Sequence, residues 1–358
     1  MPIGLVPGQL GDLINTTLPK LKKTHIDTMR QVAYPLTQLT FLKAKETADG
    51  GTSYQWRVRV SDKGTFRFVG MWDTGGQTVQ KDVFNYLNVP WVHWQESMEF
   101  DEKEPAMNAG AARIVEELKG RRSATYESIY NGIEDSLSLP PLNSSDFKNL
   151  WGPLYWFPTL VVGSTDPVGG FNGTTVTFQD TTTSTVIGGV DRSLPFNTRL
   201  RSWVATYSDI NSSDFIKTLI RARTRTAFQT MPWLEGEKPA QDRGVLLVNQ
   251  PTRDELVYRA NLGPDRWGND TAYPTTETTI QSFTLVPVPT WDTLSYSPIV
   301  GLKASKWRGM VLQNRWMNER KPMNTPNAPD IWQVWVQGSC LSACEDVRSG
   351  GFCIHKGR

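Results

Sequence analysis

The most regular hydrophobic pattern in the chain lies between Asn108 and Leu137. Apolar residues recur there every three or four positions, which places them along one face of a helix. Those positions are Ile114, Leu118, Tyr126, Ile129, Tyr130, Ile133 and Leu137. Asn108 suits the beginning of the helix, and Pro140 with Pro141 ends it. At 1.5 Å per residue the helix is about 45 Å long, an outlier against an average of about a dozen residues. We therefore predict a long helix that serves as a strut for other parts of the chain.

A strict alternation of apolar and polar residues begins at Tyr54 and predicts a strand with one apolar and one polar, largely basic face. The apolar positions are Tyr54, Trp56, Val58 and Val60, and the polar ones are Gln55, Arg57 and Arg59. A turn at 61–64 and the aromatic residues Phe66 and Phe68 predict that the strand returns as a hairpin. Two-stranded ribbons are only marginally stable alone. The hairpin must therefore lie on its own core or on a neighbouring subunit.

The rest of the chain reads as strands, loops and two shorter helices. After Pro141 the sequence is rich in Gly, Thr, Ser and Asn, which is typical of loops and strands. Residues 212–228 predict a helix whose last turn holds arginines, either to complement the helix dipole or to form a basic surface that faces nucleic acid. A strand and a short helix are expected at 243–262. Further strands are expected at 82–100, 282–289, 331–336 and 351–354.

Composition narrows the class of protein. A chain of 358 residues is long for one core and predicts two lobes. The longest apolar run, 154–162, contains Pro158 and is too short to span a bilayer, so no membrane association is expected.

The first residues lack a basic leader, which favours an intracellular, soluble protein. A formal net charge of +2 gives no overall electrostatic reason for nucleic-acid binding. Fourteen tryptophans favour an assembling protein or a carbohydrate binder.

No motif in the chain predicts catalysis, a cofactor or a metal. Cys340, Cys344, Cys353 and His355 have a spacing that fits no common structural zinc site, so we expect ordinary reduced thiols. Phosphate-loop, dinucleotide and zinc-protease motifs are absent from the sequence. His25, His93 and His355 lie too far apart in sequence to suggest a local triad, and His93 is expected to be structural. A glycosidase stays open, because its two acids need not be neighbours in sequence.

Two stretches carry a resemblance to a known family. The first runs from Gly188 to Ser202 and continues through 205–207 to the helix that ends near Phe228. The second comprises 283–289, 291–293, 298–301, 331–336 and 347–352. Together with the order of arm, hairpin, long helix, Gly/Thr-rich lobe and returning terminal strand, they resemble the major capsid (coat) proteins of tailed bacteriophages, which have the Hong-Kong-97-like fold.

The resemblance implies an α+β fold with five parts. These are an N-terminal arm at 1–50, an extended loop (β-hairpin) at 51–80, a peripheral domain at 81–140 with its spine helix at 108–137, an axial domain at 141–306, and return strands of the peripheral domain at 307–358. Related coats often carry two basic residues in the last turn, whereas this chain has only Arg348. Some relatives crosslink through a loop lysine. Lys63 occupies that place here, but no partner is evident and we expect no crosslink.

The resemblance also implies a function. Copies would form pentamers and hexamers that close into an icosahedral head shell around double-stranded DNA, with no enzymatic activity. The shell would be assembled in the host bacterial cytoplasm, with portal and scaffolding or decoration proteins as further partners. Candidate interface residues on the hairpin are Trp56, Arg57, Arg59, Lys63, Phe66 and Arg67, and those on a neighbour's helix are Glu116, Glu127 and Glu134. Candidate residues for non-specific DNA contact are Lys20, Lys22, Lys23, Arg221 and Arg225.

Two alternatives remain open at this point. An encapsulin-like compartment shell would have the same fold and hold cargo proteins in place of DNA. A Trp-rich β-protein that binds or cleaves glycan would instead show exposed aromatic residues along a groove. The basic residues near the N-terminus fit an arm that touches an acidic partner or nucleic acid, but they fit a solvated terminal segment better.

Overall fold

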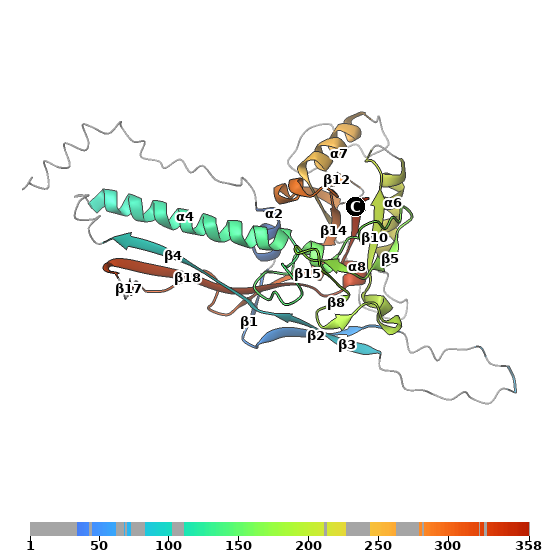
Figure 1. The fold of residues 1–358 in the computed structure, drawn as a ribbon, viewed down its shortest axis with the longest axis horizontal. Helices are drawn as coiled ribbons and strands as arrows, with labels where there is room; N and C mark the ends of the chain where they lie inside the picture. Colours follow the sequence, from blue (N-terminus) through green and yellow to red (C-terminus); the bar gives the residue numbers. More distant parts are fainter. Residues whose placement is uncertain are drawn as a thin grey trace, which may run out of the picture.

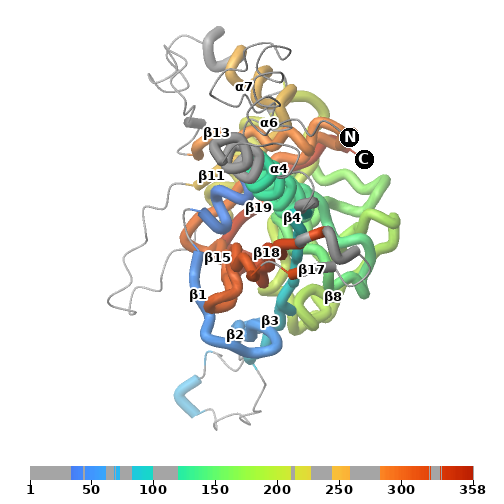
Figure 2. The backbone as a smooth tube through the Cα atoms, turned by 90° about the vertical axis from the view of Figure 1, so that its left-hand side faces the viewer, coloured from blue at the N-terminus to red at the C-terminus, as the bar shows by residue number. Residues whose placement is uncertain are grey.

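Two large β-sheets, a two-stranded ribbon and three longer helices dominate the described part of the chain. The computed structural model describes residues 34–42, 45–61, 68, 70–72, 83–101, 111–210, 213–226, 244–262, 279–280, 283–321, 323–325 and 328–357. Helix α4 runs along the strands β4 and β18, and a second sheet with α6 and α7 stands across the end of that helix (Figure 1). Seen from the side, α4 lies above β4 and β18, with β2 and β3 at the far edge (Figure 2). No helix in the described ranges has the length and apolar content that a membrane span needs.

Helix α4, Ala111–Ser138, confirms the prediction of a long helix. Its buried side includes Ile129, Ile133 and Leu137, which are at most 6% exposed. At the last turn the indole Nε1 of Trp291 donates to the Ser138 carbonyl oxygen at 2.7 Å, which satisfies one of the carbonyls that every helix end leaves free. The chain then returns past the helix end at Gly152, where a Cβ atom would collide with the Leu137 carbonyl oxygen. The end of α4 is therefore a tightly packed junction.

The sheet beside α4 is built on β18, a strand of 17 residues from Ala328 to Cys344. It pairs antiparallel with β4, Val92–Asp101, and with β15, Trp307–Leu312. The other strands of this six-stranded sheet are β1 (Lys45–Ala48), parallel to β15, and the short β16 (Asn318–Glu319) and β17 (Met323–Thr325), both on β18. The strands predicted near 82–100 and 331–336 are thus partners. His93 of β4 bonds to Ser339 of β18 at 2.7 Å, in line with a structural role.

The second sheet has seven strands in the order β12-β13-β11-β14-β19-β10-β5. In chain order they are β5 (Gly170–Gly173), β10 (Ser202–Tyr207), β11 (Gly244–Val248), β12 (Thr279–Ile280), β13 (Phe283–Pro287), β14 (Ile299–Lys303) and β19 (Gly351–Lys356). Helix α6, Ser213–Thr226, contributes Phe215, Leu219 and Ala222 to the core of this sheet. Helix α7, Gln250–Leu262, follows β11 directly. The predicted strand and helix at 243–262 and the predicted helix at 212–228 are both confirmed over their described residues.

Short elements join these parts. The helical ones are α2 (Pro35–Thr37), η1 (Gln38–Leu42), α5 (Pro153–Trp156), η2 (Pro195–Leu200), η3 (Pro289–Thr293), η4 (Ala304–Lys306) and α8 (Val347–Gly350). Two small hairpins pair β6 (Val176–Thr177) with β7 (Thr183–Ser184) and β8 (Val186–Ile187) with β9 (Val190–Asp191).

The partner strand predicted for the ribbon is wrong. Strand β2, Ser53–Arg59, pairs with β3, Phe84–Pro90, and not with a strand at 65–68. Phe68 lies outside any strand and is 91% exposed, while Phe66 lies outside the described residues. Strand β3 is favoured because it adds Leu87 and Val89, each 2% exposed, to the apolar inner side of the ribbon. The connection between the two strands therefore spans residues 60–83, more than the turn at 61–64 that the sequence predicts.

Two predicted boundaries also need correction. Residues 35–42 and 45–48 belong to the folded core and not to an arm, because Leu36 and Phe41 are buried and β1 joins the six-stranded sheet. Residues 307–358 do not act as one set of return strands. Strand β19 lies inside the seven-stranded sheet between β14 and β10, since its side chains are buried on both faces and suit a central position.

Glu134 is a further correction. We predicted an exposed acid on α4, but its side chain is fully buried. One carboxylate oxygen accepts the Leu36 N–H at 3.1 Å, and the other accepts the N–H and hydroxyl of Thr37 at 2.8 and 2.7 Å. Burial raises the pKa of Glu134, and the hydrogen bonds from Thr37 and Leu36 lower it part of the way back. Glu134 thus joins α2 to α4 within one chain and is not available to a neighbour.

The substitution Glu134→Gln tests this junction. The amide nitrogen would face backbone N–H or hydroxyl donors, so at least one buried donor loses its acceptor. We expect a loss of about 1–3 kcal/mol in the free energy of unfolding, measured by urea denaturation of unassembled subunits. The control is Asp49→Asn, an exposed acid, which should leave the midpoint unchanged. Equal midpoints for both variants would contradict the junction.

Candidate assembly interface

The ribbon of β2 and β3 has two chemically different faces. Along β2 the side chains alternate between half-buried Tyr54, Trp56 and Val58 and exposed Gln55, Arg57 and Arg59, as the sequence predicts. The half-buried residues pack against the main core of the chain. The outward side of β3 carries Phe84 and Tyr86, which are 43% and 60% exposed. One face therefore fixes the ribbon, and the other presents arginine and aromatic side chains.

Trp56 is the anchor of the inner face. Its indole Nε1 donates to the Glu345 carbonyl oxygen at 3.0 Å, just beyond the end of β18. Its ring stacks on Tyr54 at 5.2 Å between centroids and lies 6.1 Å from Trp156, whose side chain is fully buried. Although predicted as an interface residue, Trp56 thus makes its contacts within its own chain, where it sets the position of the ribbon.

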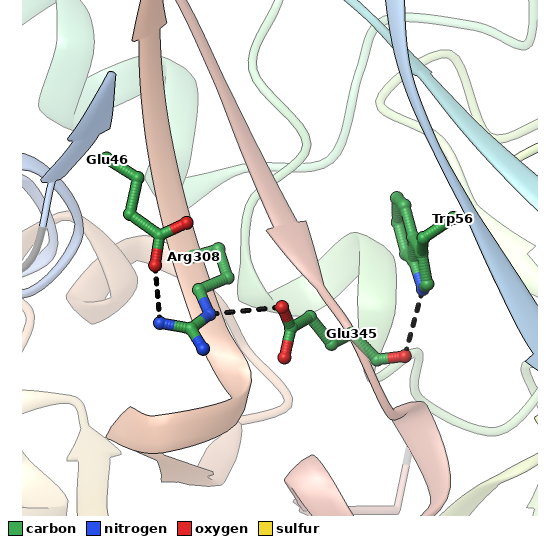
Figure 3. A network of polar contacts seen from close by, with 4 residues as sticks. All are labelled: Glu46, Trp56, Arg308 and Glu345. Carbon is green, nitrogen blue, oxygen red and sulfur yellow. Dashed lines mark hydrogen bonds and ion pairs between the residues drawn. The ribbon is translucent and has the colours of Figure 1, made fainter. Parts of the chain in front are cut away.

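A chain of ion pairs continues from this anchor, as Figure 3 shows. The guanidinium of Arg308 on β15 bonds to Glu46 of β1 at 2.6 Å and to Glu345 at 3.1 Å. All three side chains are about a third to a half exposed, so solvent screens the pairs and each contributes little to stability. They connect β1 and β15 to the residue that follows β18, whose carbonyl oxygen binds Trp56.

The outer face holds its arginines against aromatic rings and backbone. The guanidinium of Arg57 lies 4.0 Å from the ring centroid of Phe84, a cation–π contact. Arg57 stands opposite Tyr86 in the ribbon register, and Arg59 stands opposite Phe84. The Nε of Arg59 also donates to the Ser61 carbonyl oxygen at 3.3 Å. These contacts preorganise two positive charges on one exposed surface, which we name the outer ribbon face (Arg57, Arg59, Phe84 and Tyr86).

The other predicted interface residues divide into three groups. Lys63, Phe66 and Arg67 lie outside the described residues. For Glu116 the structure describes the helix but not the side chain. Glu127 is half-buried and interacts within its own chain.

Phe84 and Tyr86, by contrast, were not among the predicted residues. The sequence gives no clear signal for them, because both faces of 84–90 carry apolar residues and one asparagine.

The predicted basic residues are only partly described. Arg221 and Arg225 are exposed, one turn apart near the end of α6, while Lys20, Lys22 and Lys23 lie outside the described residues. Arg223 is exposed on the same last turn. This end of α6 is therefore a small basic surface on the side of the seven-stranded sheet.

The cysteines form no shared site. Cys340 and Cys344 lie on β18 and Cys353 on β19, in different sheets, and all are at most 1% exposed. Burial raises the pKa of the Cys340 thiol to about 12. His355 is also buried, and its Nε2 accepts the Leu160 N–H at 3.0 Å. Within the described ranges no group of three or more His, Cys, Asp or Glu residues is placed to hold a metal ion.

Comparisons with known proteins identify the fold. No protein-family model matches the chain, and no curated protein matches it in sequence. The capsid asymmetric unit of cyanophage A-1(L) has a TM-score of 0.61 at 13% identity, over 97% of this chain and 99% of that chain. The capsid of a native GTA particle has a TM-score of 0.55 at 10% identity, over 96% of each chain. The holo-SrpI encapsulin of Synechococcus elongatus PCC 7942 has a TM-score of 0.50 at 10% identity, over 96% of this chain and 94% of that chain.

This chain therefore has the fold of phage capsid building blocks, an α+β fold of the Hong-Kong-97-like class, as the resemblance predicts. The match extends over nearly the whole length of both chains.

The anchor predicts a local effect of substituting Trp56. Trp56→Ala removes a half-buried indole and its hydrogen bond, so we expect the ribbon to lose about 2–3 kcal/mol of local stability. Hydrogen exchange measured by mass spectrometry should then accelerate by roughly 30-fold or more in β2. The exchange rate in β2 of Trp56→Phe should lie between those of Trp56→Ala and the natural protein. The matched control is Tyr86→Ala on the outer ribbon face, and equal exchange in Trp56→Ala and Tyr86→Ala would contradict the anchor.

Proposed function

We propose that this protein is the major capsid protein of a tailed bacteriophage. Copies assemble into pentamers and hexamers, and these close into an icosahedral head shell around double-stranded DNA. The observation that carries the proposal is the ribbon. Its inner face is fixed to the core by Trp56, while its outer face leaves Arg57 and aromatic rings exposed. The capsid fold over nearly the whole chain supports it.

The outer ribbon face has the chemistry of a protein interface. Arginine, tyrosine and phenylalanine are enriched where proteins meet, and arginine and tyrosine also among the residues that dominate binding energy. Because Arg57 already lies on Phe84, less side-chain freedom is lost when a partner binds. With Glu134 excluded, Glu116 and Glu127 remain as acids of a neighbour's helix that the arginines would pair with. Lys63, Phe66 and Arg67 would extend the same contact.

Further partners belong to the same proposal. A shell of this kind needs a portal and works with scaffolding or decoration proteins, and it contacts packaged DNA non-specifically. Arg221 and Arg225, with Lys20, Lys22 and Lys23, are the residues that we assign to DNA. The shell would be assembled in the host bacterial cytoplasm and would form the virion head. The role is structural, and we assign no enzymatic activity.

Reversing the charge of the outer ribbon face tests the assembly proposal. Arg57→Glu with Arg59→Glu should prevent or strongly reduce shell formation, because like charges would meet at the contact. Negative-stain electron microscopy of the purified protein gives the readout. The matched control, Arg57→Lys with Arg59→Lys, keeps both charges and should still form shells. Normal shells from the glutamate variant would refute the assigned contact.

An encapsulin-like compartment is the second candidate, because the fold also matches an encapsulin. The two functions differ in what the shell encloses. Nuclease-resistant DNA of genome length inside purified particles supports the phage capsid, whereas a defined set of enclosed enzymes supports the compartment.

The DNA assignment predicts a separate effect. Arg221→Glu with Arg225→Glu should leave shells intact but lower the fraction of filled heads, because phosphate contacts are lost. The fraction is counted by cryo-electron microscopy after complementation of a phage that lacks the natural gene product. Arg221→Lys with Arg225→Lys keeps the charge and should fill normally. An unchanged fraction of filled heads in the glutamate variant would remove these residues from the assignment.

A further inference from the structure

His355 of β19 is fully buried, and backbone groups engage both of its ring nitrogens. The Leu160 N–H can only donate, so Nε2 accepts it at 3.0 Å. The Lys356 carbonyl oxygen can only accept, so Nδ1 donates to it at 2.8 Å. These two contacts require the neutral imidazole with its proton on Nδ1, because the imidazolium ion carries a second proton on Nε2, where Leu160 donates. The folded contact therefore excludes the charged form of His355.

The residue that His355 binds leads directly into a surface loop at 161–168. The exposed apolar side chains of this loop are Val161, Val162 and Val168, at 44%, 63% and 62%. The Ser164 N–H donates to the Val161 carbonyl oxygen at 3.0 Å, which turns the chain back on itself. The loop thus presents apolar side chains to solvent, and its position depends on the contacts at its two ends.

The far end of the loop has a separate anchor on the neighbouring strand. The Thr206 hydroxyl of β10 accepts the Asp166 N–H at 2.9 Å, and the Thr206 N–H donates to the Asp166 carbonyl oxygen at 2.9 Å. Thr206 stands opposite His355 in the parallel register of β10 and β19. The Thr218 hydroxyl of α6 adds a bond to the Pro167 carbonyl oxygen at 3.1 Å. Of these anchoring side chains, only His355 titrates near neutral pH.

We propose that His355 is an acid-sensitive latch, which holds the beginning of the 161–168 loop at neutral pH and releases it in acid. An unrestrained histidine takes up a proton near pH 6.5, roughly. The latched ring has no room for a proton on Nε2, so the released state binds more protons and gains stability as the pH falls. The latch is therefore complete above about pH 6.5 and weakens progressively below it. The anchor at Thr206 remains, so acid frees the loop at one end only.

The titratable groups packed around His355 stay neutral or oppose a positive charge there. Burial raises the pKa of Tyr207 on β10 to about 12 and also raises the pKa of the Cys353 thiol on β19, so both are uncharged at neutral and acid pH. The ring of Tyr296 meets the imidazole edge-on, with centroids 6.4 Å apart. Lys356 follows directly in β19 and carries a like charge.

Two acids lie near the same end of β10. The Asp166 carboxylate accepts the Gly169 N–H at 2.9 Å and the Asn172 Nδ2 at 2.8 Å, so it is occupied in shaping its own loop. Asp209 follows β10 and is exposed, so solvent and salt screen its charge. The blocked Nε2 therefore decides where His355 can bind a proton.

Hydrogen exchange of the full-length natural protein, measured by mass spectrometry at pH 7.5 and pH 5.5, tests the latch. After correction for the intrinsic effect of pH on exchange, protection of the segment 157–162 should fall about tenfold, because proton uptake favours the released state by that factor. The control is β11 in the same sheet, whose residues do not titrate and whose protection should stay unchanged. Equal protection of 157–162 at both pH values would overturn the latch.

Two substitutions assign the effect to His355. His355→Gln offers an amide oxygen in place of Nε2 and does not titrate, so protection at pH 7.5 should be kept and the fall at pH 5.5 should disappear. His355→Leu removes the acceptor, so exchange in 157–162 should be fast at both pH values. A fall that persists in His355→Gln would overturn the assignment. The measurement on the natural protein decides the latch even where a variant does not fold, and it requires no shell, so it is independent of the proposed function.

Discussion

The structure depends on the backbone pairing of one strand, β18. It holds β4, β15, β16 and β17 in one sheet, and its continuation leads directly into the second sheet. Just past the last residue of β18, the Glu345 carbonyl oxygen accepts a hydrogen bond from the indole of Trp56. The Glu345 carboxylate accepts one from the guanidinium of Arg308. Asp346 then caps α8 through the N–H groups of residues 348 and 349 and turns the chain into β19. Sheet, ribbon and second sheet are therefore positioned from one stretch of backbone.

Two buried charges show how the parts around β18 are held together. Glu134 joins α4 to α2 through hydrogen bonds to backbone and hydroxyl groups and has no basic partner among them. Arg192 is 1% exposed, and its Nη1 donates to the Trp156 carbonyl oxygen at 3.3 Å. Burial lowers the pKa of Arg192 to about 9. Burying a charge costs free energy unless hydrogen bonds compensate it. An arrangement in which Glu134 or Arg192 lost its hydrogen-bond partners would therefore be strongly disfavoured. Both therefore specify one arrangement of the chain.

Local patterns predicted elements well and their partners poorly. The helical period from Ile114 to Leu137 predicted α4 to within three residues at its start and one at its end, and the alternation from Tyr54 predicted the two faces of β2. The partner of β2 was missed because Phe66 and Phe68 are near in sequence, whereas the choice of β3 depends on how Leu87 and Val89 bury in a distant core. The burial of Glu134 was missed for the same reason, since its donors on α2 lie about a hundred residues away. The fold was predicted from the order of the segments along the chain, which does not depend on these long-range contacts.

The distribution of strong and weak contacts suits a protein that must assemble. Inside the chain, the ribbon is held by the aromatic ring of Trp56 and its hydrogen bond to the Glu345 carbonyl oxygen, and salt hardly changes the strength of either contact. Outside, the charged groups are exposed, and an exposed ion pair stabilises a contact by only about 0–1 kcal/mol. Such contacts are too weak to join two copies alone, but a ring of copies makes several at once, and each forms at the high effective concentration that the others create. Wrong pairings can therefore separate again before a shell closes, while the complete ring persists.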